Sequence, residues 1–139
     1  MKKITSVGKA FLVVTIFLIS AEVDGQTADE FYKSATGKVG NYEYDAAMAD
    51  YTKAIELDDT NPTYYDNRAW SKTEKENYAG AVEDYTVSIE LYPSDPETYY
   101  QRGLVKLLMN NNYDGCLDLK RADEMGLPDA KAVIKKSCK

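Results

Sequence analysis

The sequence contains no histidine, and this absence narrows the chemistry open to the chain. Histidine is the commonest general base near neutral pH and a common metal ligand, so His-based triads and His-ligated metal centres are excluded. The only two cysteines are Cys116 and Cys138, so a zinc site built on them would lack two ligands. No paired carboxylates, nucleophile motif or phosphate-binding loop stands out in the sequence. We therefore expect neither an enzyme nor a metal or cofactor site.

Basic residues are scarce as well. In 139 residues, 17 Lys and Arg stand against 23 Asp and Glu, which gives a net charge of −6. Binding to nucleic acid or to an anionic membrane surface requires a basic face, so neither partner is expected. Aromatic residues, in contrast, make up 12% of the chain, with twelve tyrosines. A disordered acidic chain would be poor in aromatics, so the composition favours one packed domain.

Long apolar runs are absent except near the start of the chain. Lys2 and Lys3 precede about ten apolar residues, 10–19, which are followed by small and polar residues up to Gln26. This length suits the core of a secretory signal peptide, whereas a membrane-spanning helix needs about 20 residues. We therefore expect residues 1–25 to be a cleaved signal peptide, with an uncleaved N-terminal anchor as the alternative. No Cys lies near the junction, so the expected product is an exported protein, periplasmic or secreted, and not a lipoprotein.

The rest of the chain resembles itself at a fixed offset of 34 residues, so that position 50 matches position 84. Residues 50–57 (DYTKAIEL) and 84–91 (DYTVSIEL) are identical at six of eight positions, and the same offset carries Tyr44 to Tyr78. A third copy is expected with one extra residue in the turn at 110–112. The matched pairs are then Tyr78 with Tyr113, Ala81 with Cys116 and Pro93 with Pro128. A fixed period of this length indicates stacked copies of one supersecondary unit.

Each unit is predicted to be a pair of helices. Pro62 and Pro96 suit the first turn of a helix, and Asn61 and Asp95 precede them as caps. Within the second helix, apolar residues recur at spacings of three and four, as on the buried stripe of an amphipathic helix. In the second unit these residues are Tyr78, Ala81, Val82, Tyr85 and Ile89.

This 34-residue helical hairpin resembles the tetratricopeptide repeat. The second unit matches the family pattern with Tyr65, Ala69, Tyr78, Ala81, Tyr85, Ser88 and Pro93, whereas the third places Lys120 where an aromatic is usual. The resemblance implies an all-α, right-handed α-solenoid over residues 26–139. Its parts would be repeats at about 28–61, 62–95 and 96–128 and a capping helix at 129–138. The seven tyrosines at repeat positions are expected in the core: Tyr44, Tyr51, Tyr65, Tyr78, Tyr85, Tyr99 and Tyr113.

The two cysteines are predicted to form a disulfide. Each lies eleven residues from Leu127, in the turn between the last two helices, so an antiparallel hairpin places Cys116 and Cys138 at the same height. Export into an oxidising compartment favours the bond, and two buried free thiols are the alternative. The cysteine placement is similar to that of other short exported repeat proteins of Bacteroidota-like bacteria.

The resemblance also implies where a partner would bind, because the first helix of each pair lines the concave groove of such arrays. The expected lining is Asp29, Tyr32 and Thr36 in the first unit, Asp66, Trp70, Thr73 and Glu74 in the second, and Glu97, Tyr100, Leu104 and Leu107 in the third. This lining is aromatic and aliphatic with acidic edges, so the expected ligand is a protein segment with apolar anchors and some basic residues. Trp70 is either a binding anchor or a packing residue.

Family members that clamp an acidic C-terminal tail carry Lys, Asn and Arg in the groove. Here the matching positions hold Tyr32, Thr36, Asp66 and Glu97, and only Asn67 fits, so an acidic tail is not the expected ligand. The favoured hypothesis is a protein-binding adaptor. The alternative is a structural envelope protein that associates with itself through an uncapped first repeat.

Overall fold

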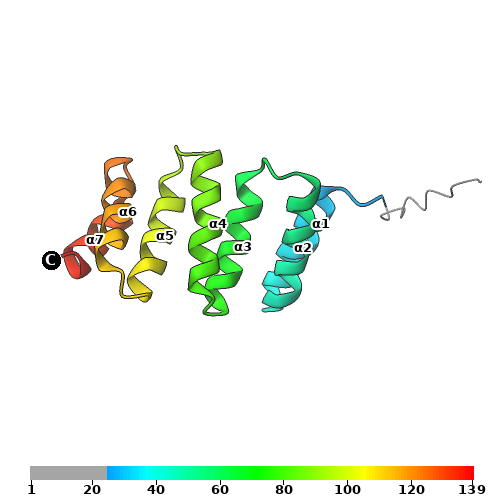
Figure 1. Ribbon diagram of the computed structural model, residues 1–139, viewed down its shortest axis with the longest axis horizontal. Coiled ribbons are helices and arrows are strands. Elements are labelled where there is room, and N and C mark those ends of the chain that lie inside the picture. Colours follow the sequence, from blue (N-terminus) through cyan, green and yellow to red (C-terminus); the bar gives the residue numbers. More distant parts are fainter. Residues whose placement is uncertain (1–24) are drawn as a thin grey trace, which may run out of the picture.

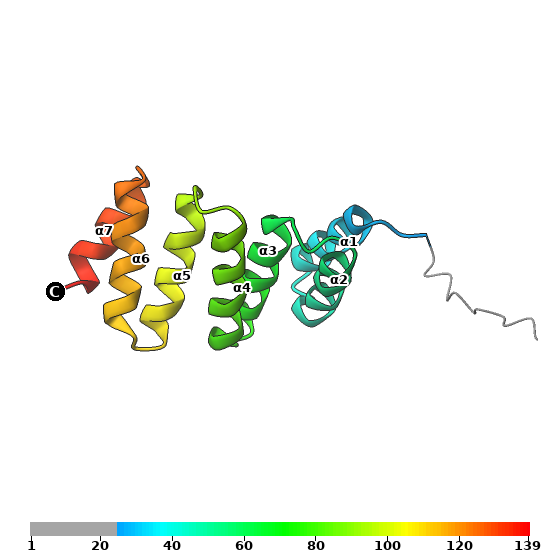
Figure 2. The same cartoon turned by 45° about the horizontal axis from the view of Figure 1, so that its top comes forward.

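The computed structural model describes residues 25–139, and this range forms seven α-helices and no strand (Figure 1). The helices are α1 (Ala28–Gly40), α2 (Tyr44–Leu57), α3 (Pro62–Glu74), α4 (Tyr78–Leu91), α5 (Pro96–Leu108), α6 (Asn112–Glu124) and α7 (Pro128–Ser137). The predicted all-α solenoid is therefore correct. Three helix pairs, α1/α2, α3/α4 and α5/α6, follow one another in a row that α7 closes (Figures 1 and 2).

The predicted signal peptide lies outside the described residues, apart from Gly25. Among the helices of residues 25–139, none is long and apolar enough to cross a bilayer.

The helix starts follow from proline and from short polar caps. Pro62, Pro96 and Pro128 occupy the first turns of α3, α5 and α7, where a missing backbone N–H breaks no helical bond. The Asn61 side chain accepts a hydrogen bond from the backbone N–H of Thr63 at 3.0 Å, and Asp95 caps α5 in the same way. These caps satisfy N–H groups that would otherwise lack a partner.

The turn inside each helix pair has one repeated conformation. Tyr42, Glu76 and Asn110, which follow one another at the repeat period, have positive φ angles of 63°, 59° and 60°. Gly126 has a φ of 93° and gives α6 and α7 a three-residue connection like those inside the pairs. Glycine takes this left-handed conformation without a steric penalty.

The prediction that the third unit has one extra residue in its turn is wrong. Asn77 and Asn111, the N-caps of α4 and α6, lie one repeat period apart, and both accept a backbone N–H at the third helical position. Gly115, not Cys116, therefore takes the buried place of Ala81. Three adjacent asparagines gave the sequence alignment two registers, and helix packing selects one of them.

Further expectations change with this register. Tyr113 is 75% exposed and is not a core residue. Leu119, fully buried, takes the place of Tyr85, so Lys120 does not interrupt the pattern. Pro128 begins α7 as Pro96 begins α5, so the capping helix runs from Pro128 to Ser137 and not from 129 to 138. Of the other tyrosines expected in the core, Tyr51, Tyr65 and Tyr85 are buried, while Tyr44, Tyr78 and Tyr99 are half-buried.

Small residues set the spacing inside each pair. Ala69 and Ala81 are fully buried where α3 meets α4. In the third pair both positions are glycine: a Cβ on Gly103 would lie 2.9 Å from the carbonyl oxygen of Gly115. This distance is shorter than van der Waals contact, so the approach of α5 to α6 depends on the missing side chains.

A buried ionic cluster repeats along the array. In the second pair, Arg68 donates two hydrogen bonds to Asp84 at 2.8 and 2.7 Å, and Lys72 pairs with the same carboxylate at 2.8 Å. A third guanidinium N–H donates to Thr52 Oγ1 of the preceding unit at 3.1 Å. The cluster therefore joins the two helices of one pair and connects them to the unit before.

The third unit repeats this arrangement and the first simplifies it. Arg102 and Lys106 bind Asp118 with distances of 2.7 to 2.8 Å, and Arg102 also donates to Thr86 of the preceding unit. In the first unit, Asp50 receives one cation, Lys38, and the hydroxyl of Ser34 replaces the arginine.

Candidate functional site

A pocket of about 180 Å³ lies between the first helices of the second and third units, α3 and α5. Tyr85, from α4, belongs to its lining. Its polar residues include three carboxylates, so it is acidic as well as aromatic. The lining residues are Asp66, Asn67, Trp70, Tyr85, Asp95, Glu97, Thr98 and Gln101.

Asp66 is the most constrained carboxylate of this pocket. The hydroxyl of Thr98 lies 3.2 Å from both Asp66 oxygens and 3.0 Å from Asp95 Oδ2. Burial raises the pKa of Asp66, and the nearby Asp95 raises it further, while the Ser88 and Thr98 hydroxyls partly offset the rise. A cation at this position would relieve the cost of burying the negative charge.

Trp70 forms an aromatic wall of the pocket and also packs inside the fold. Its ring meets that of Tyr44 edge to face, with centroids 5.7 Å apart, and 37% of the residue stays exposed. The packing alternative for Trp70 thus has a structural basis in the Tyr44 contact, and the binding-anchor alternative stays a prediction. One edge of the indole is fixed against α2, and the remainder faces solvent beside Asp66.

Glu97 and Asp95 complete the acidic side at the start of α5. Glu97 is exposed and accepts a hydrogen bond from Gln101 at 2.7 Å. Asp95 Oδ1 caps the helix by accepting from the backbone N–H of Glu97 at 3.0 Å. The three carboxylates of Asp66, Asp95 and Glu97 have no cationic partner within 4 Å among residues 25–139. No side chain of the described residues therefore neutralises the negative charge of this pocket.

The predicted residues of the first unit lie apart from this pocket. Tyr32 packs against Tyr51 and Tyr64, with ring centroids 6.0 and 5.3 Å away. Thr36 donates its hydroxyl to the carbonyl of Lys33 at 2.9 Å. Both side chains therefore serve the packing and the helix itself, and Asp29 accepts a bond from the Tyr64 hydroxyl at 3.2 Å.

Two other predicted residues of α3, Thr73 and Glu74, do not line the pocket. Thr73 donates to the carbonyl of Ala69 at 3.0 Å, and Glu74 is exposed beside the Tyr44 hydroxyl, whose pKa is raised by burial and by that carboxylate.

The remaining predicted residues belong to α5. Tyr100 and Leu104 are half-buried, and burial raises the pKa of Tyr100, as do Asp129 and Glu97. Leu107 approaches Gly115 of α6 and belongs to the packing of the third pair.

Of the residues predicted to line the groove, the structure thus brings three into one pocket: Asp66, Trp70 and Glu97. Sequence reasoning missed Tyr85, Asp95, Thr98 and Gln101 as lining residues. Asp95 was assigned only a capping role and Tyr85 only a core role. The repeat period could have predicted Gln101, because it lies one period after Asn67, which was considered as a groove residue.

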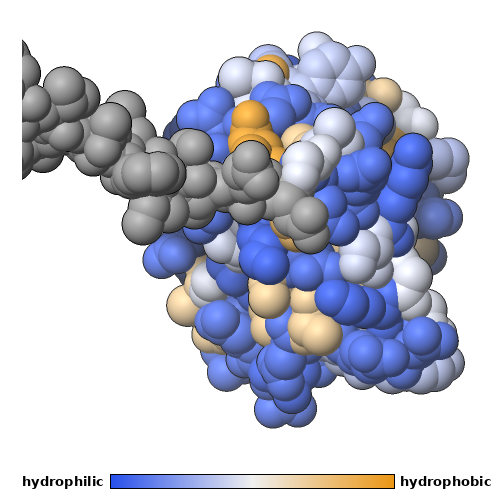
Figure 3. Space-filling view, turned by 90° about the vertical axis from the view of Figure 1, so that its right-hand side faces the viewer, coloured by the Kyte–Doolittle hydropathy of each residue, from blue (hydrophilic) through white to orange (hydrophobic). Residues whose placement is uncertain are grey.

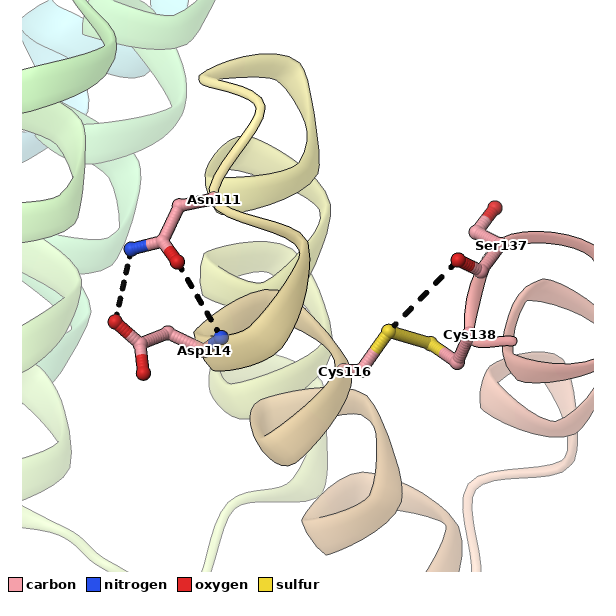
Figure 4. Close-up of a disulfide and its surroundings, with 5 residues drawn as sticks. All are labelled: Asn111, Asp114, Cys116, Ser137 and Cys138. Atoms are coloured by element: carbon pink, nitrogen blue, oxygen red, sulfur yellow. Dashed lines mark hydrogen bonds between the residues drawn. A yellow bond between two sulfur atoms is a disulfide. The ribbon is translucent and has the colours of Figure 1, made fainter.

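The disulfide predicted between Cys116 and Cys138 is present, with Cα atoms 5.7 Å apart (Figure 4). It ties the end of α7 to the first half of α6. Between residues 25 and 139, no group of three Cys, Asp or Glu side chains is placed to hold a metal ion.

The N-terminal end of the array bears on the self-association hypothesis. Thr27 and Glu30 cap α1 reciprocally, with backbone-to-side-chain distances of 2.9 and 3.3 Å. Viewed from this end, the surface outside the grey atoms is mainly hydrophilic (Figure 3). Self-association through this end stays a prediction.

Solved structures share the fold of residues 25–139. The first TPR domain of Spaghetti (RPAP3), bound to the HSP90 peptide SRMEEVD, is 24% identical, with a TM-score of 0.77 over 84% of this chain and 94% of that one. The second TPR domain of human RPAP3, in complex with the HSP70 peptide SGPTIEEVD, is 23% identical, with a TM-score of 0.76 over 81% and 95%. The Arabidopsis OM64 TPR domain is 22% identical, with a TM-score of 0.75 over 78% and 92%.

No protein-family model matches the sequence. The repeat period of the sequence, the seven helices and the likeness to these solved structures nevertheless indicate the same fold. The described part of the chain has the fold of a tetratricopeptide-repeat domain.

Proposed function

We propose that this protein is an exported adaptor of the tetratricopeptide-repeat family that binds a segment of a partner protein. The segment would lie along the first-helix face formed by α1, α3 and α5, with one basic side chain in the pocket between α3 and α5. The binding role is supported by the solved domains of this fold, two of which hold peptides. Export is supported by the basic and apolar character of residues 1–25.

The pocket between α3 and α5 is the observation that carries this proposal. Asp66, Asp95 and Glu97 supply negative charge, while Trp70 and Tyr85 supply aromatic surface. A Lys or Arg side chain fits both, because its methylene stem packs on rings and its head meets carboxylates. A partner carboxylate placed here would face three like charges.

The peptides held by the RPAP3 domains end in the sequence EEVD, in which three of four residues are acidic. The acidic residues in the pocket of this chain favour the opposite charge in its ligand. Asp66 strengthens this preference because its charged form is partly buried without a cation.

Selection from a random peptide library tests the proposal. The purified protein is the bait, and selected peptides are measured by isothermal titration calorimetry. We expect Lys or Arg beside an apolar residue in the selected peptides. Asp66→Asn and Trp70→Ala should each weaken binding about tenfold or more, as expected for central contacts of an interface.

Matched variants separate the pocket from general effects. Asp123→Asn removes an exposed carboxylate of α6, and Tyr113→Ala removes an exposed aromatic of the same helix. Both should leave affinity within about twofold, because neither residue lines the pocket. Enrichment of acidic peptides, or equal losses in the pocket and matched variants, would refute the basic-ligand proposal.

A further inference from the structure

We propose a second binding site, at the opposite end of the array from α1, for an acidic segment of a protein partner. The site is the cavity beside the disulfide, between α6 and the end of α7, with a volume of about 510 Å³. It is separate from the α3–α5 pocket in both position and charge, so it does not depend on the function proposed above. Its lining includes Tyr113, Leu117, Lys120, Lys136 and Lys139.

Lysines on two elements give the site its positive charge. Lys120 comes from α6, and Lys136 and Lys139 come from the end of the chain. Over residues 25–139, none of the three pairs with a carboxylate within 4 Å. Residues 130–139 contain four lysines and no acidic residue, although the chain as a whole has a net charge of −6. The basic charge is therefore local and is not paired with an acidic side chain, which favours an anionic ligand.

Exposed apolar side chains lie between these charges. Tyr113 and Leu117, one helical turn apart on α6, are 75% and 47% exposed. The corrected register explains the exposure, because Gly115 and Leu119, not Cys116 and Lys120, turn toward the core. An aromatic and an aliphatic side chain beside lysines suit carboxylates with an apolar residue among them.

The disulfide shapes the site. Cys116 and Cys138 both line the cavity, and their bond ties the end of α7 to α6 (Figure 4). Tyr113 and Leu117 of α6 line the same cavity. Without the bond, Lys136 and Lys139 would be carried by the unanchored end of α7. The bond therefore keeps the lysines of the two elements in the lining of one cavity.

Charge distribution favours a peptide over an anionic membrane. A membrane surface attracts clustered basic residues in proportion to their number and repels nearby acidic ones. Three lysines line the cavity of a chain whose net charge is −6, so a broad anionic surface would also face many acidic residues. A short acidic segment can contact the cavity alone and avoid the acidic remainder.

Fluorescence anisotropy with a labelled peptide tests the site. The probe is a short peptide in which Asp and Glu flank one Phe, and its matched control carries Asn and Gln in their place. We expect saturable binding of the acidic probe, weakened by salt, and no binding of the amide control. The Lys120→Glu, Lys136→Glu double variant should lose at least about tenfold in affinity.

The Lys131→Glu, Lys135→Glu double variant is the control for net charge. It makes the same charge change on α7 with residues that do not line the cavity. Its affinity should stay within about threefold, because only long-range attraction is altered. Equal losses in the two double variants would overturn the site, since binding would then follow net charge alone.

Two further variants separate a built cavity from a loose group of lysines. Cys138→Ser removes no lysine from the sequence but releases the end of α7, which carries Lys136. We therefore expect weaker binding, and unchanged affinity would overturn the proposed geometry. Trp70→Ala, in the other pocket, should leave the acidic probe bound as before, so failure of one site is distinguishable from failure of the other. Binding to phosphatidylserine vesicles without binding to the peptide would overturn the choice of a protein ligand.

Discussion

Replacing Asp84 by Asn tests the buried ionic cluster that repeats along the array. The substitution keeps the side-chain volume and removes the charge that Arg68 and Lys72 share. These two side chains are only 17% and 18% exposed, so neither can recover full hydration without moving. Removing one partner of a buried ion pair costs about 3–5 kcal/mol, and the residual exposure places this case near 3 kcal/mol.

That loss is large for a domain of this size, whose total free energy of unfolding is about 5–15 kcal/mol. The assay is urea unfolding followed by far-ultraviolet circular dichroism, with the free energy of unfolding extrapolated to water. The same extrapolation for the unchanged protein gives the reference.

Asp50→Asn is the matched control. Asp50 receives one cation, Lys38, whose side chain is 33% exposed, and a hydroxyl from Ser34. Because Lys38 can turn toward water, the expected loss is about 1 kcal/mol. If Asp84→Asn lowers the free energy of unfolding no more than Asp50→Asn does, the unpaired charges of Arg68 and Lys72 do not have the expected cost.

The contribution of Asp50 also depends on pH in a defined direction. Burial raises its pKa, but the bonds from Lys38 and Ser34 outweigh burial and leave the pKa below its ordinary value of 3.8. The stabilisation is therefore complete above the ordinary pKa and disappears as pH falls through the lowered one.

Three further perturbations test other parts of the fold. Cys138→Ser should lower the free energy of unfolding by about 3 kcal/mol, because the disulfide closes a loop between residues 22 apart in sequence. Hydrogen exchange should then show α7 opening first, and unchanged protection of the α7 amides would contradict this. Gly103→Ala should lower the free energy of unfolding by about 1–3 kcal/mol, because its Cβ would meet the Gly115 carbonyl, and an unchanged urea midpoint would contradict the close approach. Tyr51→Phe should stabilise by about 1 kcal/mol, since the fully buried hydroxyl has no hydrogen-bond partner within the described residues. Burial raises the pKa of Tyr51 to about 12, so the unchanged protein should lose stability from about pH 10 to 12, and the Phe variant should lose less; identical alkaline unfolding would contradict this account.

The acidic pocket has a consequence for stability as well as for binding. Because burial raises the pKa of Asp66, its charged form is disfavoured in the free protein. Asp66→Asn should therefore bind a basic peptide more weakly while unfolding no more easily, as is common for residues kept for binding.

Local sequence determined the helices of this protein. The repeat period, the prolines at helix starts and the caps can all be read along the chain, because the prolines and caps act within a few residues. The disulfide was also predictable, because two positions equally far from a turn meet when the helices pair. Residues 116 and 138 satisfy this condition in either register of the third unit, since it depends only on the last turn.

Only the tertiary structure decided the register of the third unit, the composition of the pocket and the basic cavity. Asn110–Asn112 permits two alignments, and burial of Leu119 with the approach of Gly103 to Gly115 selects one. Asp66 and Glu97 come from different units, so which groove residues share a pocket depends on how α3 and α5 pack. Periodicity assigns each side chain to a face, but contact between faces of different helices is a property of the packed array.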